Sequence, residues 1–149
     1  MGSQSDYSVM RDCEKILRIL KIKYQASIVS AHRTPKRMFE FAESASKNGF
    51  AVIIAGAGGS AHLPGMIASL ATVPVIGVPI ESRKLKGLDS LLSIVQMPKG
   101  CPTATMAING AFNAGLHAAS IIGTFDLKVR SNLEKWKRLQ TKSVKKKLK

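Results

Sequence analysis

The sequence predicts an α/β protein in which helices cover both faces of a parallel sheet. Along its 149 residues, segments with apolar residues at helical spacing alternate with short segments that are continuously apolar. Continuously apolar strands are typical of a parallel sheet, because both of their faces are buried. With 45% hydrophobic residues the chain can form one core of ordinary size, so we expect a single domain of this class.

The N-terminal part of the chain predicts two helices and two strands. Apolar residues recur at helical spacing within residues 6–22, and a strand is expected at 24–29. Pro35 then favours the first turn of a second helix, in which Met38 faces inward. The short apolar run at 51–55 predicts the next strand.

The remainder of the sheet follows the same alternation. We expect helices at 63–70, 87–95 and 110–122, separated by strands at 73–78 and 103–108. Parallel strands need crossovers of this kind, because a short turn cannot return the chain to the same edge.

The end of the chain differs from this α/β part. We expect residues 1–125 to form the α/β domain and residues 126–149 to form a C-terminal helical segment with a basic tail. The helix predicted at 125–140 carries an apolar stripe among charged residues, formed by Leu127, Leu133, Trp136 and Leu139. This stripe needs a cover, which either its own domain or another subunit could provide.

The charge of the chain is concentrated at the same end. The formal net charge is +14, and residues 128–149 hold ten Lys or Arg and one Glu, a balance of +9. A Lys-rich terminus is typical of a solvated end, and non-specific attraction to polyanions is the alternative. Aromatic residues make up only 5% of the chain, so no stacking platform for bases is visible. We expect no specific nucleic-acid partner.

The cysteines and apolar runs bear on the compartment. Cys13 falls in a helical pattern and Cys101 in a Gly-Cys-Pro turn, which favours two reduced thiols over a disulfide framework. Gly and Pro interrupt the apolar runs well before the roughly 18 residues that a membrane helix needs. We therefore expect a cytoplasmic protein without a membrane partner.

Candidate site residues gather where predicted strands end. In an open parallel sheet, ligands bind beyond the carboxyl ends of the strands, where small residues admit a ligand and hydroxyl and amide groups donate to phosphate. The segments at 2–6, 30–35 and 55–66 have this character. Their candidate residues are Ser3, Asp6, Ser30, His32, Arg33, Gly58, Gly59 and His62.

Each of these residues has a structural alternative. Arg33 could hold a phosphate by forked hydrogen bonds or lie on the surface near a helix start, and Asp6 could bind sugar hydroxyls or cap a helix. His32 could carry a proton at neutral pH or be structural. His62 could orient a carboxylate or cap the helix near residue 63, and the glycines could serve only a tight turn. Short paired ligand spacings are lacking, so we expect no metal. We also expect no cofactor.

Four motifs together resemble the PurE family. They are Gly-Ser-Gln-Ser-Asp at 2–6, Ser-Ala-His-Arg-Thr-Pro at 30–35, the glycine-rich run at 55–66, and Gly-Leu-Asp-Ser-Leu-Leu-Ser-Ile-Val-Gln-Met-Pro at 87–98 followed by Ala-Ile-Asn at 107–109. The resemblance covers roughly residues 1–125 and implies a flavodoxin-like three-layer sandwich with strand order 2-1-3-4-5.

The same resemblance implies an activity and a set of roles. The family moves the carboxylate of N5-carboxyaminoimidazole ribonucleotide to C4 in purine biosynthesis, with His32 as the catalytic residue and the other candidates holding the substrate. Arg33-Thr34 is similar to the mutase class, whereas the carboxylase class that uses free carbon dioxide typically has Lys-Gly there. That carboxylase remains the alternative enzyme, and a non-catalytic nucleotide-binding or polyanion-binding module is the alternative of another kind.

One departure from the family pattern concerns the start of the sheet. An apolar strand precedes the Met-Gly-Ser turn in PurE-like chains, whereas here Met1 is that Met. The first strand of the family order is therefore missing, which suggests a fragment, a misassigned start or a lost fusion partner such as the carboxyaminoimidazole ribonucleotide synthetase. An apolar segment restored before Met1 should raise stability and activity. The resemblance also implies a homo-octamer held together partly by the C-terminal helix.

Overall fold

The structure is a computed structural model that describes residues 1–146. Its elements are η1 (Gln4–Asp6), α1 (Tyr7–Ile19), α2 (Pro35–Ser44), β1 (Ile53–Gly58), α3 (Leu63–Ala68), β2 (Val75–Ile80), α4 (Leu88–Val95), β3 (Ala104–Thr105), α5 (Ala111–Ile122) and α6 (Leu127–Ser143). Each of the six predicted helices has a counterpart, and the short 3₁₀ helix η1 directly precedes α1.

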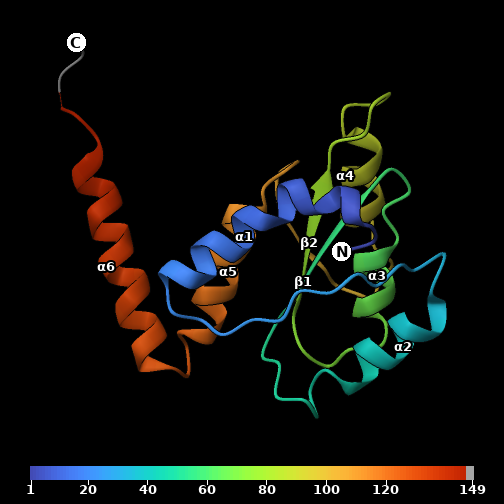
Figure 1. Cartoon of the computed structure of the whole chain (residues 1–149), viewed down its shortest axis with the longest axis horizontal. Coiled ribbons are helices and arrows are strands. Elements are labelled where there is room, and N and C mark those ends of the chain that lie inside the picture. The colour runs from blue at the N-terminus through green and yellow to red at the C-terminus, as the bar shows by residue number, and fades with distance from the viewer. Residues whose placement is uncertain (147–149) are drawn as a thin grey trace.

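The strands form one parallel sheet in the order β1-β2-β3, with Ile53 opposite Val75 and Ile76 opposite Ala104. Helices α1 and α5 lie on one face of this sheet, and α2, α3 and α4 lie on the other (Figure 1). All six residues of β2 are buried, because β2 is the middle strand and both of its faces are covered. The predicted parallel α/β architecture is confirmed.

Alternate residues of the sheet feed two apolar clusters. Ile53 and Ala55 of β1 pack with Met38, Leu63 and Ile67 on the α2–α3 side. Ile76 and Val78 of β2 belong to the second cluster, on the α1–α5 side. The list of its buried members is completed by Met10, Cys13, Leu17, Ile80, Ala111, Ala114 and Ala118. Because both faces of the sheet are covered, the carboxyl ends of its strands remain open, and the site residues lie there.

The strand predicted at 24–29 is wrong, since these residues lie extended without a strand ladder. A strand needs a hydrogen-bonded neighbour along its length, and this segment is bonded to another extended segment only at its end. There, Val29 N donates to Met1 O at 2.8 Å and the Met1 amine donates to Ser27 O at 3.1 Å. The strand predicted at 103–108 shortens to the two residues of β3.

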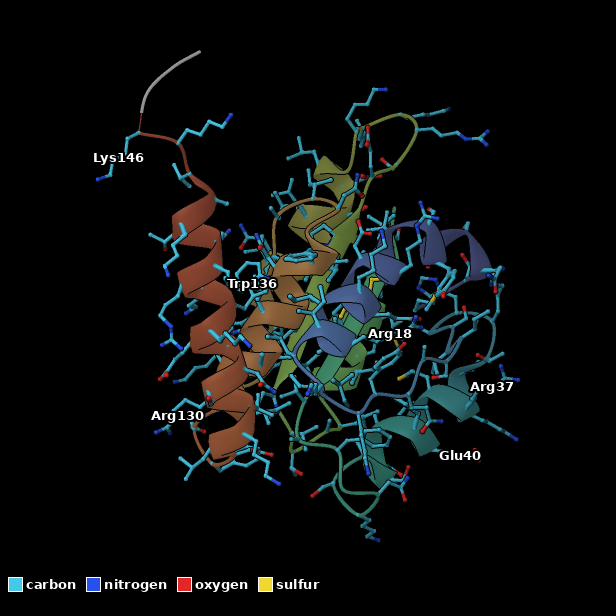
Figure 2. All side chains as sticks on the ribbon, turned by 60° about the vertical axis from the view of Figure 1, so that its left-hand side comes forward. Arg18, Arg37, Glu40, Arg130, Trp136 and Lys146 are labelled. Atoms are coloured by element: carbon cyan, nitrogen blue, oxygen red, sulfur yellow. The ribbon has the colours of Figure 1, made fainter. Side chains whose placement is uncertain are left out.

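Helix α6 lies at one end of the molecule, beside α5 (Figure 1). Asp126 caps it by accepting from Lys128 N at 2.8 Å and Val129 N at 3.1 Å. Trp136 contacts Phe112 of α5 with ring centroids 5.9 Å apart, and Arg130 donates to Gly123 O at 2.7 Å and to Thr124 O at 3.1 Å (Figure 2). The predicted apolar stripe is therefore divided: Leu133 is buried, and Leu127 and Leu139 remain exposed.

Within residues 1–146, none of the helices combines the length and the hydrophobicity that crossing a membrane would take.

Candidate functional site

A cavity of about 790 Å³ opens beyond the carboxyl ends of β1 and β2. It is lined by η1, the turn before α2, the glycine-rich turn after β1 and the loop after β2. All eight residues predicted for the site lie in its wall. Backbone geometry explains this convergence, because parallel strands end at one edge and their following turns must meet there.

Two histidines face each other across the cavity wall. His32 Nε2 lies 2.8 Å from His62 Nδ1, and the rings are perpendicular with centroids 4.9 Å apart. One of these nitrogens must donate and the other accept, so only one proton lies between the rings. Both side chains are exposed to the cavity, and the side chain of His62 does not cap α3. The capping alternative for His62 is therefore wrong.

Arg33 joins two of the turns. Its Nη2 donates to Gly2 O at 3.1 Å, and its Nε donates to Ser30 Oγ at 3.4 Å. Ser30 is buried, and its hydroxyl also accepts from Arg33 N at 3.3 Å. This second bond holds the backbone of Arg33, and so the base of its side chain, in place. The guanidinium thus stands at the cavity with a permanent positive charge.

Asp6 stands at the N-cap position of α1, but its side chain takes part in a capping box at η1 with Ser3 instead. Its side chain makes no capping hydrogen bond to α1. Instead, Oδ2 accepts from Ser3 N at 2.9 Å, so the carboxylate turns back toward the first turn of the chain. Asp6 is buried, yet it lines the cavity together with Ser3 and Ser5. A carboxylate oriented in this way can accept further hydrogen bonds from a ligand.

The glycine-rich turn is held by a residue that the sequence analysis did not select. Gly59 has φ of 67°, a conformation that favours glycine, and its N–H donates to Ser90 Oγ at 2.8 Å. The Ser90 hydroxyl in turn donates to Ile80 O at 2.7 Å and is fully buried. Ser90 therefore ties the turn after β1 to the end of β2. A serine among the apolar residues of a predicted helix was the signal that could have found it.

The opposite wall contains a second residue that was missed. Asn109 has φ of 58°, and its Oδ1 accepts from Glu81 N at 3.0 Å while Nδ2 donates to Glu81 Oε2 at 3.2 Å. Its own N–H donates to Pro79 O at 2.8 Å. Asparagine tolerates this left-handed conformation, so its position after a predicted strand was an available signal.

Metal ligation has no support in this wall. Among residues 1–146, no three His, Cys, Asp or Glu side chains are grouped so that they could hold a metal ion. Cys101 lies elsewhere, with its thiol donating to Gly65 O at 3.2 Å. The groups that this wall offers to a ligand are hydrogen-bonding backbone and hydroxyl groups, the two imidazoles and the cation of Arg33.

Comparisons with known proteins show which family the chain resembles. A family model described as AIR carboxylase matches residues 1–143. The N5-carboxyaminoimidazole ribonucleotide mutase of Escherichia coli K12 is 53% identical over 146 residues, which are 97% of this chain and 86% of that protein. The mutase of Saccharolobus solfataricus is 61% identical over 123 residues, 83% of this chain and 78% of that protein.

A solved structure shows the same fold. The crystal structure of Treponema denticola PurE superposes with a TM-score of 0.84 at 24% identity, covering 95% of this chain and 89% of that one. This likeness supports a flavodoxin-like α/β fold, in which β1, β2 and β3 take the places of the last three strands of the expected order.

Proposed function

The chain belongs to the AIR carboxylase family, and we propose that it is an N5-carboxyaminoimidazole ribonucleotide mutase of purine biosynthesis. The observation that carries this function is an identity above half to proteins of that name over nearly the whole chain. The reaction moves the carboxylate from the exocyclic nitrogen of the aminoimidazole to C4, so its product is an isomer of its substrate.

We propose that Arg33 binds the phosphate of the ribonucleotide. The guanidinium is oriented by Ser30 and by the carbonyl of Gly2, and it donates paired hydrogen bonds that suit a phosphate. Ser3 and Ser30 would complete the phosphate contact with hydroxyl groups. On the same wall, the buried carboxylate of Asp6 would accept from the ribose hydroxyls.

The reacting carboxylate would lie against the glycine-rich turn and the histidine pair. Gly58 and Gly59 let it approach the backbone closely, and His62 orients it. The bond from nitrogen to the carboxyl carbon breaks, carbon dioxide stays in the cavity, and C4 forms a new bond to that carbon. His32 then takes the proton from C4 and transfers it to the nitrogen that has lost the carboxylate, with its imidazole oriented by His62 at 2.8 Å.

A second candidate has one observation in its favour, the description of the family model as AIR carboxylase. The two activities differ in substrate, so one experiment separates them. Purified protein is given either N5-carboxyaminoimidazole ribonucleotide, or aminoimidazole ribonucleotide with bicarbonate, and the 4-carboxy product is measured by chromatography. The mutase assignment requires product from the first substrate; product from the second alone would establish the carboxylase. No turnover of either would favour a non-catalytic module.

The exposed apolar side chains support a proposal about assembly. Leu88, Leu92 and Val95 form an exposed stripe on α4, and Phe125, Leu127 and Leu139 are exposed around α6. Apolar stripes of this kind are typical of surfaces covered by a partner. We propose a homo-octamer in the cytoplasm, with a small ribonucleotide as the only ligand, and with the carboxyaminoimidazole ribonucleotide synthetase as a candidate supplier of the substrate.

A further inference from the structure

The loop at residues 81–87, which runs from the end of β2 to the start of α4, forms one wall of the active-site cavity (Figure 1). We call it the β2 wall. Three of its residues line the cavity, namely Glu81, Ser82 and Arg83. None of them takes part in the contacts proposed for the phosphate, the ribose or the reacting carboxylate. Of the three side chains, only that of Arg83 carries a positive charge.

Hydrogen bonds hold the β2 wall near both of its ends. Glu81 N donates to Asn109 Oδ1 at 3.0 Å, and Asn109 Nδ2 donates to Glu81 Oε2 at 3.2 Å. Ser82 Oγ donates to Asp89 Oδ1 at 2.7 Å and accepts from Gly87 N at 3.3 Å. The backbone of the loop is therefore held at the edge of the cavity, and its side chains keep their places around it.

The guanidinium of Arg83 is available to a ligand. It is exposed, and it forms no ion pair with the residues that the structure describes, 1–146. The two carboxylates of the same stretch, those of Glu81 and Asp89, accept hydrogen bonds from Asn109 and Ser82 instead. An arginine stays charged at any ordinary pH, so this cation is present whenever a ligand enters the cavity.

Arg83 belongs to the part of the cavity where the glycine-rich turn lies. Gly58 is paired with Ile80 in the sheet, and a Cβ on Gly58 would lie only 3.5 Å from Ile80 O. Ser90 bonds both to Gly59 N and to Ile80 O, which holds the glycine-rich turn against the end of β2. Arg83 follows Ile80 by three residues, a span of at most about 11 Å. Its long side chain thus lines the cavity beside the proposed place of the reacting carboxylate.

The two cationic sides of the cavity offer different sets of donors. Arg33 lines the cavity together with the hydroxyls of Ser3 and Ser30, and a phosphate can use several such donors at once. On the β2 wall, the N–H of Glu81 and the hydroxyl of Ser82 already donate within the protein. The guanidinium there offers a planar pair of N–H groups by itself, which suits the two oxygens of a carboxylate.

We propose that Arg83 binds the carboxylate of the nucleotide, on the exocyclic nitrogen of the substrate and on C4 of the product, while Arg33 binds the phosphate. This inference rests on the proposed function, because it requires a ligand with two anionic groups. The ring carbon that carries the exocyclic nitrogen is the neighbour of C4, so one long side chain can reach the carboxylate in both positions. Arg83 thereby distinguishes carboxylated nucleotides from the nucleotide that lacks the carboxylate.

The test measures the binding of two nucleotides by calorimetry. One is the product, 4-carboxy-5-aminoimidazole ribonucleotide, and the other is 5-aminoimidazole ribonucleotide, which has the phosphate but no carboxylate. Both are given to the unmodified protein, to Arg83→Gln and to Lys84→Gln. Lys84 is the matched control, because it is exposed in the same loop and lies outside the cavity lining. Its substitution removes an equal charge without removing the proposed contact.

Arg83→Gln should weaken binding of the carboxylated nucleotide by about 10-fold or more, as expected for hydrogen bonds between charged groups, and binding of the other nucleotide by less than about 2-fold. Retained binding of the second nucleotide also shows that the variant is folded and that the phosphate contact is intact. Lys84→Gln should leave both affinities nearly unchanged.

A smaller loss for the carboxylated nucleotide, an equal loss for both nucleotides, or the same loss in Lys84→Gln would overturn the assignment of Arg83 and leave the proposed function standing. If the unmodified protein bound neither nucleotide, the proposed function itself would be contradicted, and the role of Arg83 with it.

Discussion

The imidazoles of His32 and His62 come from two turns that are separated by α2 and β1, yet they share one hydrogen bond of 2.8 Å. His62 therefore holds the His32 ring in one orientation, and only one proton lies between the two rings. A general acid–base catalyst needs this kind of fixed geometry, because proton transfer depends on the position of the donor.

The first prediction concerns the proton. His32→Asn should reduce kcat by about 10²-fold or more, because the amide keeps the polarity of imidazole without its titration. Substrate binding, measured by calorimetry, should be retained. His117→Asn is the matched control, since His117 is exposed on α5 and lies outside the cavity. Near-normal turnover in His32→Asn would return this residue to a structural role.

The second prediction concerns the phosphate. Arg33→Ala should weaken binding of the nucleotide by about 1.5 to 3 kcal/mol, the range for hydrogen bonds to charged groups, and should leave the dephosphorylated nucleoside almost unaffected. Arg37→Ala is the control, because Arg37 is exposed on α2 and donates to Ile28 O at 3.3 Å outside the cavity (Figure 2). Equal losses for both ligands would mean that Arg33 only holds Gly2 and the turn at Ser30 in place.

Much of this arrangement could be predicted from the sequence. The helices and the parallel sheet follow from periodicity, and the site residues follow from where the strands end. Residues 24–29 were predicted to be a strand because their own pattern suits one. Whether they form a strand depends on a hydrogen-bonded neighbour, which the segment's own residues do not reveal. Ser90 and Asn109 were missed for a related reason: each stabilises a turn that is distant in sequence, at Gly59 and Glu81.

The third prediction concerns Ser90. Ser90→Ala should lower the free energy of unfolding by about 1 to 3 kcal/mol, because Gly59 N–H and Ile80 O would lose their partner in a buried place. Urea unfolding provides the measurement. Ser120→Ala is the control, since its hydroxyl donates to Leu116 O on an exposed surface. If the two variants were equally stable, the link through Ser90 would contribute little to holding the turn.

The fourth prediction concerns assembly. Light scattering at micromolar concentration should show a particle much larger than one chain of 16.0 kDa. Leu139→Gln should shift the distribution of particle sizes toward smaller particles. Leu139 is 57% exposed, so its own subunit buries little of its apolar surface and a neighbouring subunit would bury the rest. Lys142→Gln, one turn further along α6, should leave the distribution unchanged. A monomer in the unmodified protein would contradict the proposed octamer.

The last prediction concerns the thiol of Cys13. Burial between α1 and α5 and, to a smaller extent, the nearby Glu14 carboxylate raise the pKa of this thiol to about 12. Below pH 9.0 the thiol is protonated in both the folded and the unfolded chain, so it causes no pH dependence. Above that value the unfolded chain loses the proton and the folded chain retains it. Stability should therefore fall as pH rises from 9.0 toward about 12, by at most about 1.4 kcal/mol per pH unit.

Urea unfolding between about pH 8.5 and 10.5 should show a steeper decline for the unmodified protein than for Cys13→Ala. Comparing slopes removes the contribution of the cavity that the alanine leaves. Cys101→Ala should keep the steep slope, because that thiol is only half-buried and lies outside the α1–α5 cluster. Parallel slopes for all three proteins would show that Cys13 titrates equally in both states, which would require water to reach it in the folded chain.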